Sequence, residues 1–344
     1  MADEYTNNID IDKENLLAII EDMPNQLLAG WQLAESINLK GNFHSIVLSG
    51  MGGSALAGEL LKIYLDETVN KIRKGNPLRV IINRSYSLPP EAFELNCLNI
   101  ISSYSGNTEE TLSVFEEVRQ NNLTCLGLTS GGKLLEFCLQ NKLPFIQLPA
   151  GIQPRMGLGY GLTSLLRALY QSGLIEDQQP KLEEVSLAIK NQLVRLKKNG
   201  QEIAVAIQGK TPVVYAPVQF KALALIWKIM FNENSKTPAF WNYFPELNHN
   251  EMVGFTNSQA NFHLLLLKDE QDNSQNLKRY LATTEILQDF KIGAKIIEIP
   301  EGEILYRLFA TLQIGCFASY YLAINYGQDP TPVEMVERFK SMLK

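Results

Sequence analysis

Residues 44–58, with the sequence HSIVLSGMGGSALAG, decide the fold of this chain. An apolar run that ends at Leu48 enters a loop containing Gly50, Gly52 and Gly53, and a segment with helical periodicity follows. A short apolar run, a glycine loop and a helix in this order are typical of a parallel sheet covered by helices. Glycines let backbone N–H groups approach a ligand, and the start of a helix favours negative charge, so the loop predicts an anion site.

The same pattern recurs through the first half of the chain. Two helices that break at Met23 and Pro24 come first, because the residue before a proline resists the helical conformation. Further apolar runs, each followed by a polar loop and a helical segment, predict strands at residues 78–83, 98–102, 124–128 and 144–148. With the run at 44–48, these form one doubly wound sheet.

A looser copy follows a polar stretch at residues 171–184. Its predicted helices occupy residues 182–198, 218–231 and 277–290, and its predicted strands occupy residues 212–216, 262–268 and 295–299. We therefore predict an α/β fold of two doubly wound parallel-sheet domains, residues 1–170 and residues 171–344.

The composition is that of a globular protein. The chain has 344 residues, enough for about two domains, and its 45% hydrophobic and 20% charged residues exclude the disordered and low-complexity classes. The 31 basic and 37 acidic side chains give a net charge of −6, without a basic run that could neutralise a nucleic-acid backbone. We expect no nucleic-acid partner.

The cysteines and the apolar segments bear on location. The four cysteines lack both a C-x-x-C pair and a spacing with histidine that would hold zinc, and the acidic amino terminus lacks a signal-peptide pattern. Residues 308–328 carry no charge and mimic a membrane span, but they contain Gln313, Ser319, Asn325 and three tyrosines, which favours a buried helix. We expect a cytoplasmic protein with reduced thiols, no metal and no membrane partner.

A second loop that could hold an anion lies at residues 102–111, SSYSGNTEET, where the third predicted strand ends. Hydroxyls such as those of Ser103, Ser105 and Thr108, together with free amides, can surround a phosphate without a metal. The alternative is that Thr108 only caps its helix. Two such loops at neighbouring strand ends favour a ligand site, because open α/β sheets bind ligands at their carboxyl ends.

The spacing of Gly50, Gly52 and Ala55 also satisfies the dinucleotide-binding fingerprint, which alone is a weak signal. A nicotinamide-binding unit carries an acidic residue at the end of its second strand, where this chain has Asn83 and Arg84. NAD is therefore disfavoured, whereas an NADP-binding enzyme that uses Arg84 stays open.

Acid, base and cation candidates lie outside the two loops. Glu233 is the centre of an Asn-Glu-Asn segment at a predicted helix end, where the helix dipole disfavours a carboxylate, although a solvated side chain is the common alternative. His249 lies in a polar loop, whereas His44 and His263 lie in predicted strands, where a structural role is the default. Arg155 follows the fifth strand in a Pro/Gly loop and can hold a phosphate or an oxyanion.

On these residues and motifs, the chain resembles the bifunctional phosphoglucose/phosphomannose isomerases, a branch of the phosphoglucose isomerase superfamily built from two sugar isomerase (SIS) domains. The resemblance runs from DMPNQ at 22–26 to DPTPV at 329–333. It implies two flavodoxin-like SIS domains with the active site between them. It also places the substrate phosphate on Gly52, Gly53, Ser54, Ser103, Ser105 and Thr108.

The catalytic side chains of that family match Glu233 as the base, His249 as the ring-opening group and Arg155 as the cation. A lysine of the terminal helix matches Lys340, with Arg338 and Lys344 close by. The implied reaction interconverts glucose 6-phosphate, and mannose 6-phosphate, with fructose 6-phosphate through a cis-enediol(ate). The resemblance implies neither a metal nor an organic cofactor.

The resemblance further implies a homodimer in which His249 reaches the site of the neighbouring subunit, and a place in glycolysis and gluconeogenesis. Thr331, near the site by resemblance, would leave room for both sugars. A non-catalytic SIS module that senses a sugar phosphate is the alternative from another class. Such regulators add a DNA-binding helical domain, which the acidic lead-in of this chain does not resemble.

Overall fold

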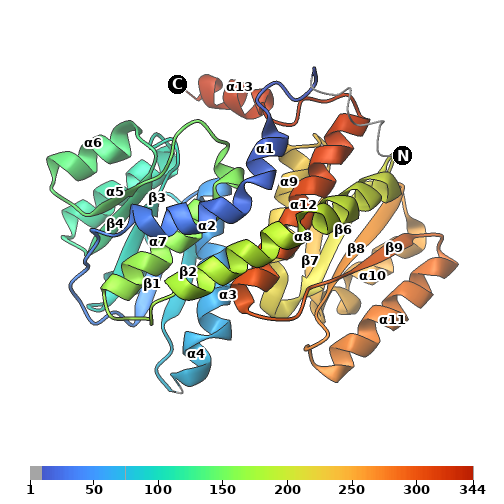
Figure 1. The fold of residues 1–344 in the computed structure, drawn as a ribbon, viewed down its shortest axis with the longest axis horizontal. Coiled ribbons are helices and arrows are strands. Elements are labelled where there is room, and N and C mark those ends of the chain that lie inside the picture. The colour runs from blue at the N-terminus through green and yellow to red at the C-terminus, as the bar shows by residue number, and fades with distance from the viewer. Residues whose placement is uncertain (1–9, 74, 344) are drawn as a thin grey trace. The chain divides into compact units, whose positions relative to one another are not determined.

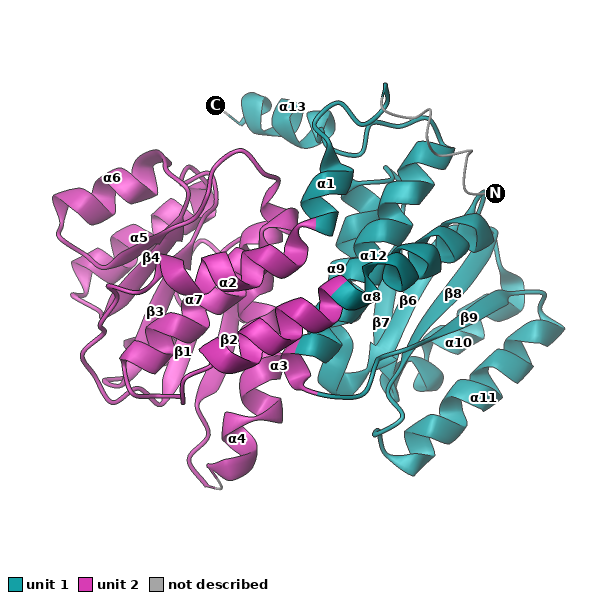
Figure 2. Cartoon of the chain, in the orientation of Figure 1, with its two compact units in different colours: residues 1–21, 191–302, 306–344 teal, residues 22–190, 303–305 magenta. Residues whose placement is uncertain are grey.

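The structure is a computed structural model that describes residues 10–73 and 75–343, and the chain divides into two compact units (Figure 2). Unit 2 comprises residues 22–190 and 303–305, and unit 1 comprises residues 1–21, 191–302 and 306–344. The division falls inside the long helix α8 (Gln179–Ile207). The predicted domain boundary at 170 and 171 lies at the end of the preceding helix, and it stays a prediction.

Unit 2 holds a five-stranded parallel sheet in the order β2-β1-β3-β4-β5, the doubly wound order of flavodoxin-like folds. All five strands predicted in the first half are confirmed within one residue at each end, because buried parallel strands are nearly continuous apolar runs. The strands are β1 (Ser45–Ser49), β2 (Arg79–Asn83), β3 (Cys97–Ser102), β4 (Cys125–Thr129) and β5 (Phe145–Gln147).

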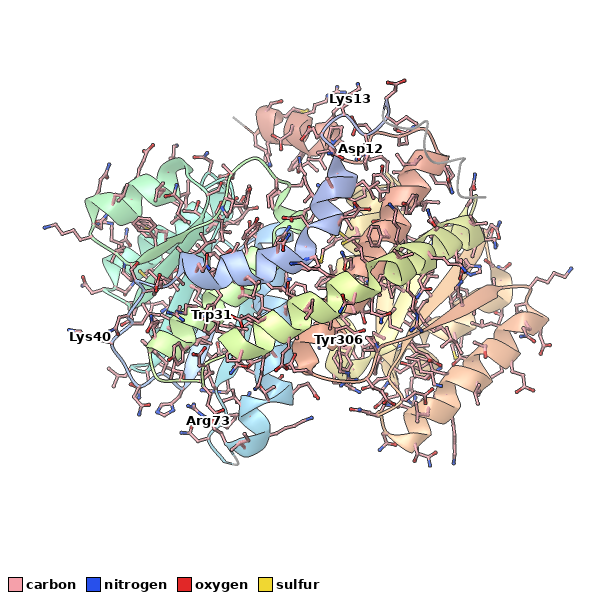
Figure 3. The ribbon with its side chains drawn as sticks, in the orientation of Figure 1. Asp12, Lys13, Trp31, Lys40, Arg73 and Tyr306 are labelled. Carbon is pink, nitrogen blue, oxygen red and sulfur yellow. The ribbon has the colours of Figure 1, made fainter. Side chains whose placement is uncertain are left out.

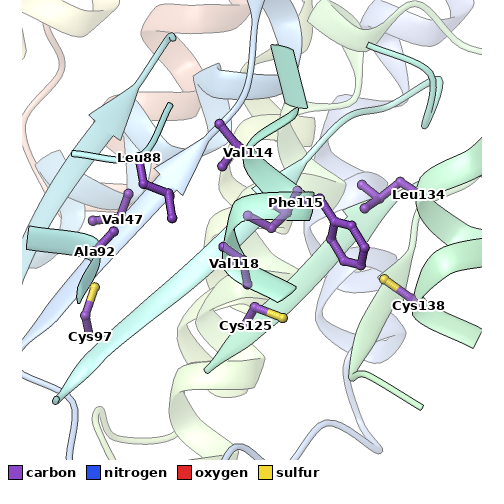
Figure 4. Close-up of a cluster of buried hydrophobic side chains, with 11 residues drawn as sticks. Val47, Leu88, Ala92, Cys97, Val114, Phe115, Val118, Cys125, Leu134 and Cys138 are labelled. Atoms are coloured by element: carbon purple, nitrogen blue, oxygen red, sulfur yellow. The ribbon is translucent and has the colours of Figure 1, made fainter. Parts of the chain in front are cut away.

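Helices cover both faces of this sheet (Figure 1). Val47 of β1 joins a buried cluster with side chains of α5 and α6 (Figure 4). Its neighbour Leu48 faces α3, where Gly58 allows close approach. Successive strand residues point to opposite faces, so both faces are apolar. The helices of the unit are α2 (Met23–Leu33), α3 (Leu56–Glu67), α4 (Val69–Ile72), α5 (Glu109–Gln120), α6 (Gly132–Gln140) and α7 (Leu158–Gln171).

The predicted break between two helices near the amino terminus is confirmed, but it lies at Asp22, one residue before the predicted position. Helix α1 (Leu16–Glu21) ends before Asp22, and Pro24 lies in the first turn of α2, where a missing N–H group costs nothing. Asp12 caps α1 (Figure 3), since its Oδ1 accepts a hydrogen bond from the backbone N–H of Leu16 at 2.7 Å.

Unit 1 holds a four-stranded parallel sheet in the order β7-β6-β8-β9. The three predicted strands are confirmed, and the sheet has a fourth strand, β7, that the sequence analysis did not identify. The missed strand, β7, is an edge strand with the mixed sequence FWNYF and mostly half-buried side chains, so it lacks both an apolar run and strict alternation. The strands are β6 (Thr211–Pro217), β7 (Phe240–Phe244), β8 (Phe262–Lys268) and β9 (Gly293–Glu298).

One face of this sheet packs against α11, where Tyr280 and Leu287 join Tyr215 and Leu264 in a buried cluster. The three predicted helices of this half are confirmed, although α8 is longer than predicted, and the amphipathic helix α13 follows near the end of the chain. The further helices are α9 (Lys221–Glu233), α10 (Glu251–Gly254), α11 (Ser274–Asp289), α12 (Ile304–Asn325) and α13 (Glu334–Met342).

Helix α12 contains the uncharged stretch. It is long and apolar enough to cross a membrane, but 94% of its apolar window is buried in the protein, as in the core helix of a globular domain. Trp227 donates its indole N–H to the backbone oxygen of Thr311 at 3.1 Å, and Gln313 donates to the backbone oxygen of Ile20 at 2.8 Å. The prediction of a buried helix is confirmed.

Candidate active site

The glycine loop follows β1 and consists of Gly50, a 3-10 turn at Gly52–Ala55 and the start of α3. Gly50 has no room for a side chain, because a Cβ atom there would lie 2.7 Å from the backbone oxygen of Ser102. Gly52 has a φ of +49°, in the left-handed region that favours glycine. The glycines therefore bring the carboxyl ends of β1 and β3 close together.

The loop after β3 is bonded to the glycine loop. The backbone N–H of Tyr104 donates to Ser54 Oγ at 2.9 Å, and Ser102 Oγ donates to the backbone oxygen of Ser54 at 2.7 Å. The two loops that were predicted separately thus form one feature at the carboxyl edge of the sheet. We call it the anion cradle and define it by Gly52, Gly53, Ser54, Ser103, Ser105 and Thr108.

The hydroxyls of the cradle bond within it. Ser103 is fully buried, and its Oγ lies 2.9 Å from Thr108 Oγ1, while the exposed Ser105 Oγ accepts from the backbone N–H of Asn107 at 3.2 Å. Thr108 precedes α5 in the N-cap position but makes no side-chain cap hydrogen bond. Capping alone therefore does not account for Thr108. The starts of α3 and α5 both lie in this feature, and helix starts favour anions.

The loop after β4 supports the cradle by interlocking with it. A Cβ atom at Gly106 would lie 1.8 Å from the backbone oxygen of Gly131, and one at Gly132 would lie 2.3 Å from the backbone oxygen of Ser105. Gly106 and Gly132 have φ values of +67° and +66°, so both positions favour glycine. The backbone N–H of Leu134 also donates to Gly106 O at 3.0 Å.

Arg155 lies beside the cradle in unit 2. It belongs to the 3-10 turn Pro154–Met156, and a Cβ atom at Gly53 would lie 2.8 Å from its backbone nitrogen. The residue is only 1% exposed, and its Nη1 donates to Gln153 Oε1 at 3.2 Å. Burying a guanidinium without hydrogen bonds is energetically unfavourable, so its bonded position should be strongly preferred.

Tyr104, which the sequence did not single out, fastens the segment before Arg155 to the cradle. Its hydroxyl donates to the backbone oxygen of Pro149 at 2.5 Å and accepts from the backbone N–H of Ile152 at 3.3 Å. Burial raises the pKa of the Tyr104 hydroxyl, which keeps it protonated as a donor. An aromatic residue between two serines of a polar loop was the available signal.

Glu233 is the last residue of α9, in unit 1, and its side chain is half-buried. The asparagines on either side are fixed, since Asn232 Nδ2 donates to Thr237 O at 2.9 Å and Asn234 Nδ2 donates to Ser319 Oγ of α12 at 2.9 Å. Lys236 Nζ donates to the backbone oxygen of Glu233 at 2.5 Å. The predicted helix-end position is confirmed, and the carboxylate is carried by a rigid turn.

His249 ends a 3-10 turn, Glu246–His249, that follows β7, and its side chain is exposed. The loop beneath it is anchored, because Leu247 is fully buried and Asn248 Nδ2 donates to Thr283 Oγ1 at 3.0 Å. The prediction of a histidine in a polar loop is confirmed. The loop begins directly at the end of the strand that the sequence analysis missed.

The topology separates Glu233 from His249 within one chain. Strands β6 and β7 are parallel neighbours, so α9 must return the chain from the carboxyl edge of the sheet to its amino edge. Glu233 ends that return, whereas His249 follows the carboxyl end of β7. The five residues of β7 alone span about 13 Å. The two side chains therefore belong to opposite edges of the second sheet.

The remaining predicted residues follow α12 in the chain. Lys340 lies on the exposed face of α13 and pairs with Glu337 at 2.8 Å, which is an ordinary surface ion pair. Arg338, on the same helix, is also exposed. Thr331 is buried in the loop after α12, with its backbone N–H donating to Asp329 Oδ1 at 3.1 Å. Lys344 lies outside the described residues.

The structure also bears on the other histidines and on Arg84. His263 is buried in β8 beside Lys210, whose Nζ lies 3.3 Å from Nδ1, so its structural role is confirmed. His44 Nδ1 lies 3.2 Å from Asn76 Nδ2 at the amino edge of the first sheet. Arg84 pairs with Glu59 at 2.8 Å. That carboxylate opposes a 2′-phosphate, which weakens the NADP alternative.

Among residues 10–73 and 75–343, no group of three or more His, Cys, Asp or Glu side chains could hold a metal ion. The candidate chemistry of the described site residues thus consists of the cradle with the backbone of Arg155 beside it, the Glu233 carboxylate on a bonded turn and the exposed imidazole of His249. These groups suit proton transfer on a phosphorylated substrate.

The two parallel sheets and the cradle define an SIS-domain protein. Residues 196–343 match the family described as "Bacterial phospho-glucose isomerase C-terminal SIS domain". A hypothetical protein from Thermus thermophilus superposes with a TM-score of 0.71 at 16% identity, covering 99% of this chain and 91% of that one. A tagatose-6-phosphate ketose/aldose isomerase from Escherichia coli gives a TM-score of 0.67 at 15% identity, covering 91% and 93%.

Curated relatives give the family. A bifunctional phosphoglucose/phosphomannose isomerase of Caldicellulosiruptor bescii is 33% identical over 94% of this chain and 97% of its own length. Its counterpart in Aquifex aeolicus is 36% identical over 88% and 91%. The chain belongs to the bifunctional phosphoglucose/phosphomannose isomerase family. A D-glucosamine-6-phosphate 4-epimerase of Sulfolobus acidocaldarius is also similar, at 31% identity over 81% and 82%.

Proposed function

We propose that this protein is an aldose–ketose isomerase that interconverts glucose 6-phosphate and mannose 6-phosphate with fructose 6-phosphate. The observation that carries the proposal is the anion cradle, in which two bonded loops meet the backbone of Arg155 at Gly53. A cradle of hydroxyls and helix starts suits a phosphate monoester, and an arginine whose backbone adjoins the cradle suits a substrate that develops further negative charge.

In the proposed reaction, the cradle holds the 6-phosphate and Glu233 is the catalytic base. Glu233 takes the proton from C2 of the open-chain aldose and returns it to C1, while the proton on O2 moves to O1, which gives the ketose. The electron pair left at C2 forms the cis-enediol(ate), whose negative charge Arg155 stabilises. The fixed asparagines around Glu233 support this role, because a base must be held within hydrogen-bond reach of its proton.

The sugar must open before that step, and we assign the opening to His249 with Lys340, which move protons between the ring oxygen and O1. The position of His249 supports a homodimer in which the residue serves the neighbouring subunit. Its imidazole is exposed and lies at the opposite edge of the second sheet from Glu233. A second copy would supply the imidazole where one chain does not.

The proposal covers both aldose configurations. After rotation about C2–C3, one base can reach the C2 proton of either the glucose or the mannose phosphate, and Thr331 would leave room for that movement. As part of the proposal, we assign the enzyme to glycolysis and gluconeogenesis, because glucose 6-phosphate and fructose 6-phosphate are its proposed substrate and product. Four buried cysteines without disulfides support a reducing, cytoplasmic location.

Two alternatives use the same cradle. A non-catalytic sensor of sugar phosphates would bind without turnover, and it leaves the fixed carboxylate of Glu233 without a role. An NADP-binding enzyme would need Arg84, which is paired with Glu59. Both are weaker than the isomerase.

The experiment is an assay of the purified protein with glucose 6-phosphate and with mannose 6-phosphate, coupled to the detection of fructose 6-phosphate. We expect turnover of both. Binding of both sugars without turnover would identify the sensor, and saturable NADPH binding would revive the third alternative. A parallel arm with glucosamine 6-phosphate, analysed for a change at C4, tests the activity that the Sulfolobus relative's name describes.

A further inference from the structure

A half-buried carboxylate lies two residues after His249, in a set of contacts that the proposed proton transfers do not use. Glu251 is the first residue of α10, and both of its oxygens are occupied. Tyr215 donates its hydroxyl to Oε1 at 2.5 Å, and Asn242 donates its amide to Oε2. Two donors on one carboxylate fix both its position and its orientation.

The two donors come from neighbouring strands. Tyr215 of β6 and Asn242 of β7 are directly opposite each other in the strand register. Residues opposite each other on neighbouring strands point to the same face of a sheet. Tyr215 and Asn242 can therefore donate hydrogen bonds to the same carboxylate. Tyr215 is fully buried, which prevents its hydroxyl from exchanging Glu251 for solvent.

His249 is therefore held from both sides. Asn248, the residue before it, is bonded to Thr283 of α11, and Glu251, two residues after it, is bonded to two strands. The imidazole itself is exposed. A loop that is fixed on both sides of one exposed side chain presents that side chain in a defined direction, as acid–base chemistry requires.

Stability alone does not require this arrangement. Apolar packing around Leu247 already joins this loop to the core. We infer that Glu251 is a positioning residue for His249, held by Tyr215 and Asn242 so that the imidazole reaches the sugar ring. This inference rests on the proposed isomerase function.

The test compares two tyrosines that bury the same kind of hydroxyl in the same cluster. Tyr215→Phe removes a donor to Glu251, whereas Tyr280→Phe removes a donor to the backbone oxygen of Leu267 at 2.9 Å. Both rings lie against Phe244, with centroid distances of 6.2 and 4.2 Å, and both residues are fully buried. Glu251→Gln is the second test variant, because it keeps the volume and removes the charge.

Two measurements are made on the full-length protein. Steady-state kinetics with glucose 6-phosphate and fructose 6-phosphate separate kcat from KM, and hydrogen–deuterium exchange reports on the peptide that covers residues 245–254. We expect Tyr215→Phe and Glu251→Gln to lower kcat about 10-fold or more with KM unchanged, since a displaced catalytic group costs rate. Exchange should rise in this peptide alone, and Tyr280→Phe should change neither kcat nor this exchange.

Unchanged kcat in both test variants would overturn the inference, even with faster exchange. An equal fall of kcat in Tyr280→Phe would do the same, because it would show a general effect of the cluster. If the wild-type protein turns over no sugar phosphate, the proposed function fails on its own. The exchange result then still decides whether Glu251 fixes this loop.

Discussion

The first and second sheets follow the same parallel plan, with very different carboxyl edges. Strands β1 and β3 end in glycine and serine loops that are bonded to each other and leave Ser105 exposed. At the end of β8, Asp269 instead pairs with Arg307 at 2.6 Å, and both side chains are 6% exposed. The Arg307 guanidinium also lies 4.8 Å from the centre of the Phe220 ring. The carboxyl edge of the first sheet is a candidate anion site, whereas a buried carboxylate–guanidinium pair occupies the end of β8 in the second sheet.

This difference shows that the fold supplies positions and the connecting loops supply chemistry. In the second sheet, the two candidate acid–base groups lie before and after the edge strand β7, away from the Asp269 pair. In the proposed function, the loops of the first sheet thus bind the phosphate, and residues of the second sheet transfer the protons. The following predictions test that division.

The largest effect is expected at Glu233. Glu233→Gln keeps the volume and removes the base, so kcat should fall about 10²- to 10⁴-fold, which is the typical contribution of general acid–base catalysis. Binding of glucose 6-phosphate, measured by calorimetry, should survive, because the cradle belongs to the other sheet. Substantial turnover in this variant would remove Glu233 from the proposed role.

The buried pair at the end of β8 should show the next largest effect, on stability. Asp269→Asn leaves Arg307 buried without its carboxylate, which should lower the free energy of unfolding by about 3–5 kcal/mol. The matched control in the first sheet is Glu94→Gln, which breaks an exposed pair with Arg79 and should cost at most about 1 kcal/mol. Urea unfolding followed by circular dichroism measures both, and equal shifts would contradict the contrast.

The carboxyl edge of the first sheet should respond in binding rather than in rate. Ser105→Ala combined with Thr108→Ala removes two cradle hydroxyls, and KM should rise about 10- to 100-fold, as expected for hydrogen bonds to a charged group. The effect on kcat should be small, because the phosphate is held equally in the ground and transition states. Ser113→Ala is the control, since this hydroxyl lies on α5, the helix that follows Thr108, and bonds only to the backbone oxygen of Tyr86 among the described contacts. A fall in kcat without a change in KM would contradict the assignment.

The smallest effect concerns His263 at the amino edge of the second sheet. Burial, together with Lys210 and Lys295, lowers the pKa of His263 to about 4. The folded state therefore binds fewer protons than the unfolded state below about pH 6.5. The free energy of unfolding thus decreases as the pH is lowered through that range. Between pH 7.5 and pH 5 this group should cost on the order of 2 kcal/mol of unfolding free energy.

His263→Gln should remove that part of the pH dependence, measured as urea midpoints at the two pH values. Lys210→Gln should reduce it only partly, because burial is the main cause of the lowered pKa. If His263→Gln keeps the full pH dependence, another group is responsible.

The sequence predicted the first sheet closely and the second incompletely, for a physical reason. Strands such as β1 and β3 are buried on both faces, so nearly every residue is apolar or small and the run stands out. The edge strand β7 mixes Trp241, Asn242 and Tyr243, whose half-buried side chains leave no such run. An aromatic cluster with high β propensity before a proline was the only local signal.

The candidate site was predictable where its residues lie close together in the sequence. The glycine loop, the Asn-Glu-Asn turn and the polar loop with His249 each stand within a few residues of sequence. The partners of Glu251 were not predictable, because Tyr215 and Asn242 become neighbours only through the register of β6 and β7. The part played by Tyr104 likewise depends on contacts with a loop 45 residues further along the chain.

The interlocked glycines next to the cradle have a consequence for protein engineering. Gly106 and Gly132 each leave space for the backbone of the other's loop, so neither loop can hold its shape alone. Transplanting residues 103–108 into another parallel sheet would therefore carry over the hydroxyls but lose their arrangement. A successful graft needs both βα connections, with Gly131 and Gly132 moved as one piece with the serines.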